Sequence, residues 1–253
     1  CFERSMGLLR PLFLSDTNLN TALAQVLASK ARLYYDLDRP VDMAWLQEAG
    51  RLMQKSSATM PKEYGDVLWL TAVCYRKQQD VVQAGNYYRQ AIFWMRKAIE
   101  SGQMLNENYL SVNEEYFLVL QESSAWPELR SRTEDLLKFA SNHFSPDSAS
   151  YWIVSANAAN LIGLALSNMD SVGPATGYFQ QSKDFYQHIL TPATAALYFS
   201  DYFNAVSNLS LMLFRKGKYD EAIALCREIL DRIERDTVIA RSPKSDIYKL
   251  QGW

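Results

Sequence analysis

The side chains that most often carry out catalysis or bind metals are few in this sequence. Two histidines occur, His143 and His188, and each falls near the end of a predicted helix, where an imidazole caps carbonyl groups and interacts favourably with the helix dipole. Cys74 and Cys226 lie on apolar faces of predicted helices, which is typical of buried thiols. No His-x-x-x-His, Cys-x-x-Cys or His-Glu pair is present. The sequence therefore predicts neither a metal site nor a cofactor.

Adjacent carboxylates are the remaining candidates for acid–base chemistry. Glu114 is followed by Glu115, and Glu134 by Asp135. Adjacent residues on a helix point about 100° apart, so the two carboxylates of each pair do not face each other and are expected to be solvated surface charges. The motifs Gly-x-Gly-x-x-Gly and Gly-x-Ser-x-Gly and the Walker loop are absent. These observations predict a protein without catalytic activity.

The composition indicates a folded helical protein of modest charge. Of the 253 residues, 48% are hydrophobic, which excludes a disordered chain. Glycine and proline number only 10 and 8, too few for the frequent turns of a β-sandwich or a barrel. The formal net charge of −2 gives no basis for nucleic-acid binding. Because no run of about 18 apolar residues occurs, no membrane span is predicted.

Prolines divide the chain into pairs of amphipathic segments. Proline begins or ends helices, because it lacks an N–H and clashes with the preceding turn. The intervals from 40 to 61, from 127 to 146 and from 174 to 192 are each roughly 20 residues, enough for a helix of about five turns. Three prolines separate the segments of a pair and four follow its second segment: Pro40, Pro127 and Pro174, then Pro61, Pro146, Pro192 and Pro243.

A repeated spacing links the two segments of each pair. In the stretch 203–236, Gly217 separates two apolar stripes, and Ser210 on the first lies twelve residues before Ala222 on the second. Both side chains are small, so two helices can approach closely there. The same spacing joins Arg32 with Ala44, Ala72 with Ala84, Phe117 with Leu129 and Gly163 with Ala175. Successive second members are 40, 45, 46 and 47 residues apart, about the period of a two-helix solenoid.

The pattern predicts ten helices in five hairpins. They are expected near 17–38 and 41–58, 63–78 and 80–100, 104–122 and 127–143, 148–169 and 173–189, and 193–216 and 219–236. Ser145, Thr191 and Ser242, each followed by proline, predict helix starts. We divide the chain into an N-terminal segment at 1–16, a repeat array at 17–240, and the start of a further or capping helix at 241–253.

These features resemble the tetratricopeptide repeat (TPR) family. The period exceeds the family's usual 34 residues, as in the long-helix variants of kinesin light chains and of arrays attached to caspase-like proteases or bacterial regulators. The resemblance implies an all-α fold, an α-solenoid of about five TPR-like helix-turn-helix repeats. It is carried by Gly163 with Ala175, by Ala72 with Ala84, and by Ser210, Gly217, Tyr219 and Ala222.

By register, the resemblance implies ligand-facing positions on the first helix of each hairpin, on the concave face of the solenoid. Asparagine amides both donate and accept hydrogen bonds, which suits the backbone of an extended peptide. The matched Lys and Asn set of chaperone-binding TPRs is not found, so a chaperone C-terminus is not the predicted ligand. The candidate partner-binding residues are Trp69, Arg76, Lys77, Asn157, Asn160, Asn168, Asn204, Ser207 and Arg215.

The predicted function is a TPR scaffold that binds a protein or peptide and catalyses no reaction. One alternative is a sensory or regulatory TPR module of a larger protein whose output domain, a protease or a transcription factor, lies outside this chain. Another is a glycan-binding lipoprotein, because mature bacterial lipoproteins begin with cysteine, as Cys1 does here, and exposed tryptophans would bind sugars. The cytoplasm is the favoured location, with a lipid anchor at Cys1 as the alternative.

Overall fold

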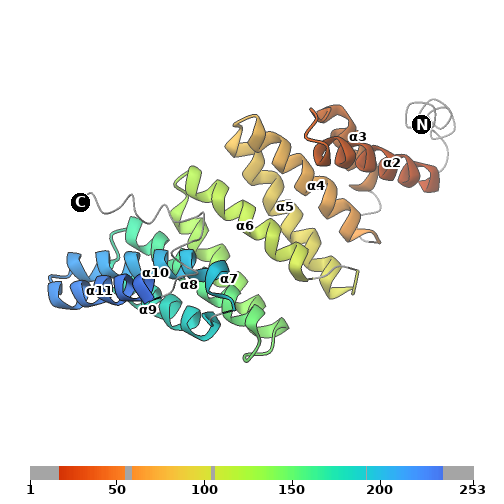
Figure 1. Cartoon of the computed structure of the whole chain (residues 1–253). Coiled ribbons are helices and arrows are strands. Elements are labelled where there is room, and N and C mark those ends of the chain that lie inside the picture. The colour runs from red at the N-terminus through yellow and green to blue at the C-terminus, as the bar shows by residue number, and fades with distance from the viewer. Residues whose placement is uncertain (1–16, 55–58, 104–105, 192, 236–253) are drawn as a thin grey trace. The chain divides into compact units, whose positions relative to one another are not determined.

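The structure, a computed structural model, describes residues 17–54, 59–103, 106–191 and 193–235 (Figure 1). Within these ranges the chain consists of helices and connecting turns, without any β-strand. It divides into two compact units, Cys1–Ser124 and Ala125–Trp253. The predicted all-α fold, a solenoid of helical hairpins, is confirmed. The predicted segments at 1–16 and 241–253, and the helix start at Ser242, lie outside the described residues.

Helices that follow each other in sequence pack together within each unit. The first unit contains α2 (Thr17–Asp36), α3 (Met43–Met53), α4 (Pro61–Lys77), α5 (Val81–Glu100) and α6 (Asn106–Glu122). The second contains α7 (Trp126–His143), α8 (Ala149–Asn168), α9 (Val172–Ile189), α10 (Ala195–Arg215) and α11 (Tyr219–Arg235). In Figure 1, α4 and α5 lie side by side as one hairpin, and their close packing is typical of the fold.

Prolines and capping residues set several of the helix starts. Pro61 is the first residue of α4, a position where its missing N–H has no intrahelical partner to lose. The predicted cap at Ser145 is wrong: α8 begins after Ser148, whose hydroxyl accepts from the Tyr151 N–H at 3.2 Å. Ser145 instead accepts a hydrogen bond from Ser148 Oγ through its carbonyl.

The turn that follows the first helix of each predicted hairpin has one residue in the left-handed region. These residues, each two positions after the first helix, have φ between 50° and 74°: Asp38, Gln79, Ser124, Asp170 and Gly217. Glycine adopts this conformation readily because it has no Cβ. Other residues adopt it at a free-energy cost of roughly 1–2 kcal/mol. Four of the five turns therefore have no glycine to mark them in the sequence.

The predicted small-residue positions lie in the core of each unit. Ala72, Ala84 and Ala175 are 0% exposed, and Ala222 is 7% exposed. A Cβ added to Gly163 would lie 2.8 Å from the ring of Phe179, so the close approach at this position depends on glycine. Other members of the predicted pairs, namely Phe117, Leu129 and Ser210, are also buried.

The first hairpin departs from the predicted register. Arg32 and Ala44, the predicted crossing pair, are both exposed, whereas Ala31 and Leu46 are buried. The reason is the length of the turn: residues 37–42 separate α2 from α3, six residues where the other hairpins have three. With three additional residues in the turn, the buried residue of the second helix lies fifteen positions, instead of twelve, after the buried residue of the first. Ala31 and Leu46 have this separation.

Two further predictions concern cysteine and histidine. Cys74 is buried as predicted, but Cys226 is exposed, because the inward stripe of α11 passes through Ala222, Ile229 and Ile233 instead. His143, in the last turn of α7, lies with Nδ1 2.9 Å from the Phe139 carbonyl oxygen, in agreement with a capping role.

Candidate functional site

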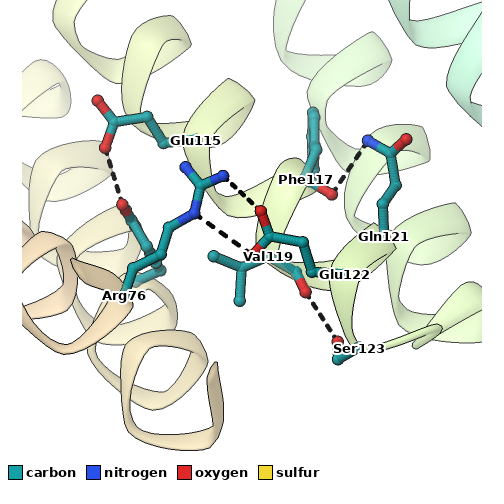
Figure 2. Close-up of polar contacts among 8 residues, drawn as sticks. Arg76, Glu115, Phe117, Val119, Gln121, Glu122 and Ser123 are labelled. Atoms are coloured by element: carbon teal, nitrogen blue, oxygen red, sulfur yellow. Dashed lines mark hydrogen bonds and ion pairs between the residues drawn. The ribbon is translucent and has the colours of Figure 1, made fainter. Parts of the chain in front are cut away.

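The predicted partner-binding residues all lie on first helices of hairpins, but many of them hold neighbouring repeats together. In the first unit, Trp69 Nε1 on α4 donates to Glu115 Oε2 on α6 at 2.9 Å. Arg76, two turns further along α4, forms an ion pair of 2.6 Å with Glu122 (Figure 2). Lys77 pairs at 3.2 Å with Asp38, the left-handed residue that follows α2.

Glu115 is the central acceptor of this first-unit network. Its Oε2 accepts from Tyr88 Oη at 2.8 Å as well as from Trp69. Tyr88 is fully buried, and burial, reinforced by the neighbouring carboxylate, raises the pKa of its hydroxyl. The carboxylate therefore satisfies a buried donor on α5 while fixing the edge of the Trp69 indole.

The second unit has a comparable set of contacts between α8, α9 and α10. Asn208 Nδ2 donates to Asn160 Oδ1 at 3.2 Å, and the Tyr186 hydroxyl donates to Asn157 Oδ1. Arg215 reaches back to Asp170, with an N–O distance of 3.1 Å. The amides of Asn157 and Asn160 thus bind neighbouring side chains of the same unit.

Three predicted residues of the second unit lie outside these inter-repeat contacts. Asn168 is exposed near the end of α8 and donates to the Leu164 carbonyl in its own helix at 2.9 Å. Asn204 and Ser207 are exposed on α10. The residues that bond one repeat to the next could have been found in the sequence, because donor and acceptor lie one repeat apart. The separation is 46 residues for both Trp69–Glu115 and Arg76–Glu122.

A groove between α2 and α4 is the candidate binding site. We call it the α2–α4 groove; its volume is about 390 Å³. Ala28 and Ser29 on α2 are small, which leaves room for it, and Trp69 forms part of its wall. Of the predicted residues only Trp69 lines it, and none of them lies on α2. The lining residues are Gln25, Ala28, Ser29, Arg32, Leu33, Asp36, Met53, Glu63, Asp66, Val67, Trp69 and Leu70.

The aromatic wall of the α2–α4 groove is held in place from several sides. The Tyr35 ring packs edge-on against Trp69, with ring centroids 5.9 Å apart. The Arg32 guanidinium lies 4.8 Å from the centroid of the Trp69 ring, within the range of a cation–π interaction. Since Glu115 fixes the indole N–H, Trp69 is a preorganised surface for a ligand.

Asp66 is a carboxyl group of the groove with a raised pKa. Burial raises the pKa of this carboxyl to about 6; Glu63 also raises it, whereas Lys62 and Arg32 lower it. The desolvation effect is the largest, so the charged form of Asp66 is less favourable here than in water.

Other features of the described residues bear on function classes. Within these residues, no group of three or more His, Cys, Asp or Glu side chains could hold a metal ion. The described tryptophans, Trp45, Trp69, Trp94, Trp126 and Trp152, are all half-buried, and none is exposed as the glycan-binding alternative requires. By length and composition α8 could cross a membrane, but half of it is buried in the unit, where it packs against α7 and α9.

Comparisons with solved structures show what this fold is similar to. BtubC (BKLC) from P. vanneervenii is 16% identical, with a TM-score of 0.58 over 100% of this chain and 90% of that chain. MamA 41-end from Desulfovibrio magneticus RS-1 is 13% identical, with a TM-score of 0.51 over 88% of this chain and 98% of that one. A Podosopora anserina putative kinesin light chain with nearly identical TPR-like repeats is 14% identical. Its TM-score is 0.51, over 82% of this chain and 92% of that chain. At these identities the likeness shows the fold alone.

Sequence comparison gives a local match. No curated protein matches the chain. A family model described as tetratricopeptide repeat matches residues 204–235, which form most of α10 and all of α11. This hairpin contains Ser210, Gly217, Tyr219 and Ala222, which carry part of the resemblance to the family in the sequence. The last described hairpin therefore has the sequence pattern of a tetratricopeptide repeat, and the fold of the chain is similar to that of TPR-like repeat structures.

Proposed function

We propose that this protein is a non-catalytic scaffold that binds a segment of another protein in the α2–α4 groove. Helical-repeat solenoids commonly use extended faces of this kind for protein–protein interaction. The observation that supports the proposal is the groove itself, about 390 Å³ beside a tryptophan whose ring and N–H are both fixed. A rigid aromatic surface loses little conformational entropy on binding and is a common anchor of interfaces.

Leu33 is the proposed apolar contact on the α2 side of the groove. Its side chain is 43% exposed although it lines the groove, so a partner can cover it. Full burial of an exposed leucine contributes about 1.5–3 kcal/mol, so covering the remaining 43% of Leu33 contributes roughly 0.6–1.3 kcal/mol, a severalfold gain in affinity. On the second unit, Asn168, Asn204 and Ser207 remain proposed contacts, since their side chains are exposed on first helices.

The experiment is selection of peptides from a random twelve-residue library on the folded chain, followed by affinity measurement through fluorescence anisotropy. We expect Leu33→Glu to weaken binding of the enriched peptides by at least about tenfold, because it places a charge in the apolar part of the groove. Leu230→Glu is the matched control: Leu230 is 47% exposed on α11, in the second unit, and its replacement should leave affinity unchanged.

Two results would overturn the proposal. One is failure of the library to yield any peptide that binds the chain better than an unrelated helical protein. The other is equal affinity of the enriched peptides for Leu33→Glu and Leu230→Glu, when both variants have the circular dichroism spectrum of the parent protein.

A further inference from the structure

The α2–α4 groove contains more negative than positive charge. Its ionisable lining residues are Arg32, Asp36, Glu63 and Asp66. Arg32 forms an ion pair with Asp36, because its Nε lies 2.9 Å from one carboxylate oxygen and 3.1 Å from the other. Within the described lining of the groove, the carboxylates of Glu63 and Asp66 have no such ion pair.

The two remaining carboxylates are placed to act together. Glu63 and Asp66 are three residues apart on α4, so they lie on one face of the helix. Asp66 is largely shielded from water, which raises its pKa to about 6. A cation gains more from a carboxylate in such a setting than from one in open solvent, because the local dielectric is lower. Lys62 on α4 and Arg32 on α2 are the cations whose charges already influence Asp66.

Most of the other lining residues of the groove are apolar. Ala28 and Leu33 on α2, Met53 at the end of α3, and Val67 and Leu70 on α4 supply this surface. Lysine and arginine side chains combine several methylene groups with a cationic end, and they cover apolar surface while keeping the charge at a polar site. The lining of the groove matches this arrangement, since it has an apolar surface for the methylenes and the carboxylates of Glu63 and Asp66 for the cationic end.

We propose that the α2–α4 groove accepts a lysine or arginine side chain from the bound segment, with its methylenes on Leu33, Val67 and Leu70 and its cationic group at Glu63 and Asp66. The inference rests on the proposed function, since it names the chemistry of the segment that binds. The proposed partner is a protein whose binding segment has a basic residue flanked by apolar residues.

The test uses four synthetic nonapeptides, identical except for the central residue, which is lysine, arginine, norleucine or glutamate between leucine and alanine neighbours. Norleucine keeps the aliphatic stem of lysine and removes the charge. We expect the lysine and arginine peptides to bind the whole chain at least about tenfold more tightly than the norleucine peptide, and the glutamate peptide to bind most weakly. In the double variant Glu63→Gln, Asp66→Asn, the lysine and norleucine peptides should bind within about twofold of each other.

The control is the double variant Asp220→Asn, Glu221→Gln, an exposed pair of carboxylates at the start of α11, which should keep the tenfold preference. Equal binding of lysine and norleucine peptides to the parent chain overturns the inference, as does a preference that survives in the Glu63→Gln, Asp66→Asn variant. If all four bind equally and Leu33→Glu abolishes binding, the proposed function stands and the inference fails. Absence of binding by all four overturns the inference, while the library selection still decides the proposed function.

Discussion

Trp69 and Glu115, forty-six residues apart in the sequence, are joined by a hydrogen bond of 2.9 Å from the indole N–H to a carboxylate oxygen. The two residues occupy first helices of successive repeats, α4 and α6. The bond therefore serves two purposes: it connects neighbouring repeats and it fixes the wall of the α2–α4 groove. Trp69 was predicted as a ligand contact, and the hydrogen bond to Glu115 holds its indole N–H in one position.

Loss of the Glu115 carboxylate should destabilise the first unit. Glu115→Ala leaves the buried Tyr88 hydroxyl without its acceptor, and an unsatisfied buried polar group costs about 1–3 kcal/mol. We expect the free energy of unfolding, measured by urea denaturation, to fall by that amount. Glu122→Ala is the control on the same helix: the Arg76–Glu122 pair in Figure 2 is partly exposed, with side chains 30% and 46% accessible, and should contribute less than about 1 kcal/mol. Equal losses in the two variants would contradict this interpretation.

Glycine in the turn between α4 and α5 should stabilise the protein. Gln79 has φ of 63°, a conformation that is unfavourable for a residue with a Cβ. Gln79→Gly should raise the free energy of unfolding by about 0.5–1 kcal/mol, the relief of strain being partly offset by the greater freedom of glycine in the unfolded chain. Gln78→Gly, one residue earlier at φ −83°, has no strain to relieve and should lower stability. A loss of stability in Gln79→Gly as large as in Gln78→Gly would contradict the prediction.

These turns explain which parts of the fold were predictable. The helices could be located because apolar residues recur at helical spacing and because prolines mark several starts, such as Pro61 of α4. The register of the first hairpin could not, since its six-residue turn has no motif that distinguishes it from the three-residue turns. The predicted pair Arg32 and Ala44 assumed a constant turn length, and a three-residue difference places other residues at the crossing.

The site was less predictable than the fold. The register correctly assigned Trp69 and Asn160 to first helices, because that depends on spacing alone. Whether a polar side chain binds a partner or its own neighbouring repeat depends on which residue lies across the helix interface. For Asn160 this residue is Asn208, one repeat further along the chain. The α2–α4 groove was missed because it results from small side chains, Ala28 and Ser29, whose position opposite α4 is a property of the packed helices.

Two glycine-to-alanine substitutions should have opposite effects in the second unit. A Cβ at position 163 would lie 2.8 Å from the Phe179 ring, so Gly163→Ala forces the two helices apart and should lower the free energy of unfolding by about 1–3 kcal/mol. Gly177 lies inside α9 with nothing within 4 Å of an added Cβ. Gly177→Ala should therefore raise the free energy of unfolding by roughly 0.5–1 kcal/mol through helix propensity. Thermal melts of the two variants test this, and a change of the same sign in both would contradict the predicted crossing.

The pH dependence of stability should reveal Asp66. Burial raises the pKa of this carboxyl to about 6 in the folded chain, above the value of about 3.9 for an unfolded aspartate. The folded state therefore binds the proton more tightly, and the free energy of unfolding contributed by this group decreases as pH rises from about 4 to about 6. Above pH 6 the ionised carboxylate destabilises the first unit.

Asp66→Asn removes that charge with little change of shape. We expect the variant to be more stable than the parent at pH 7 by up to roughly 3 kcal/mol, the free-energy equivalent of the pKa difference, and to be close to the parent at pH 4, where Asp66 is protonated in the folded chain. The measurement is urea denaturation at both pH values, with the substitution of an exposed aspartate between α7 and α8, Asp147→Asn, as the control. A gain that is equal at pH 4 and pH 7 would instead arise from packing or hydrogen bonding of the amide. A basic peptide in the α2–α4 groove should reduce the gain at pH 7, because its cation stabilises the ionised carboxylate only in the parent chain.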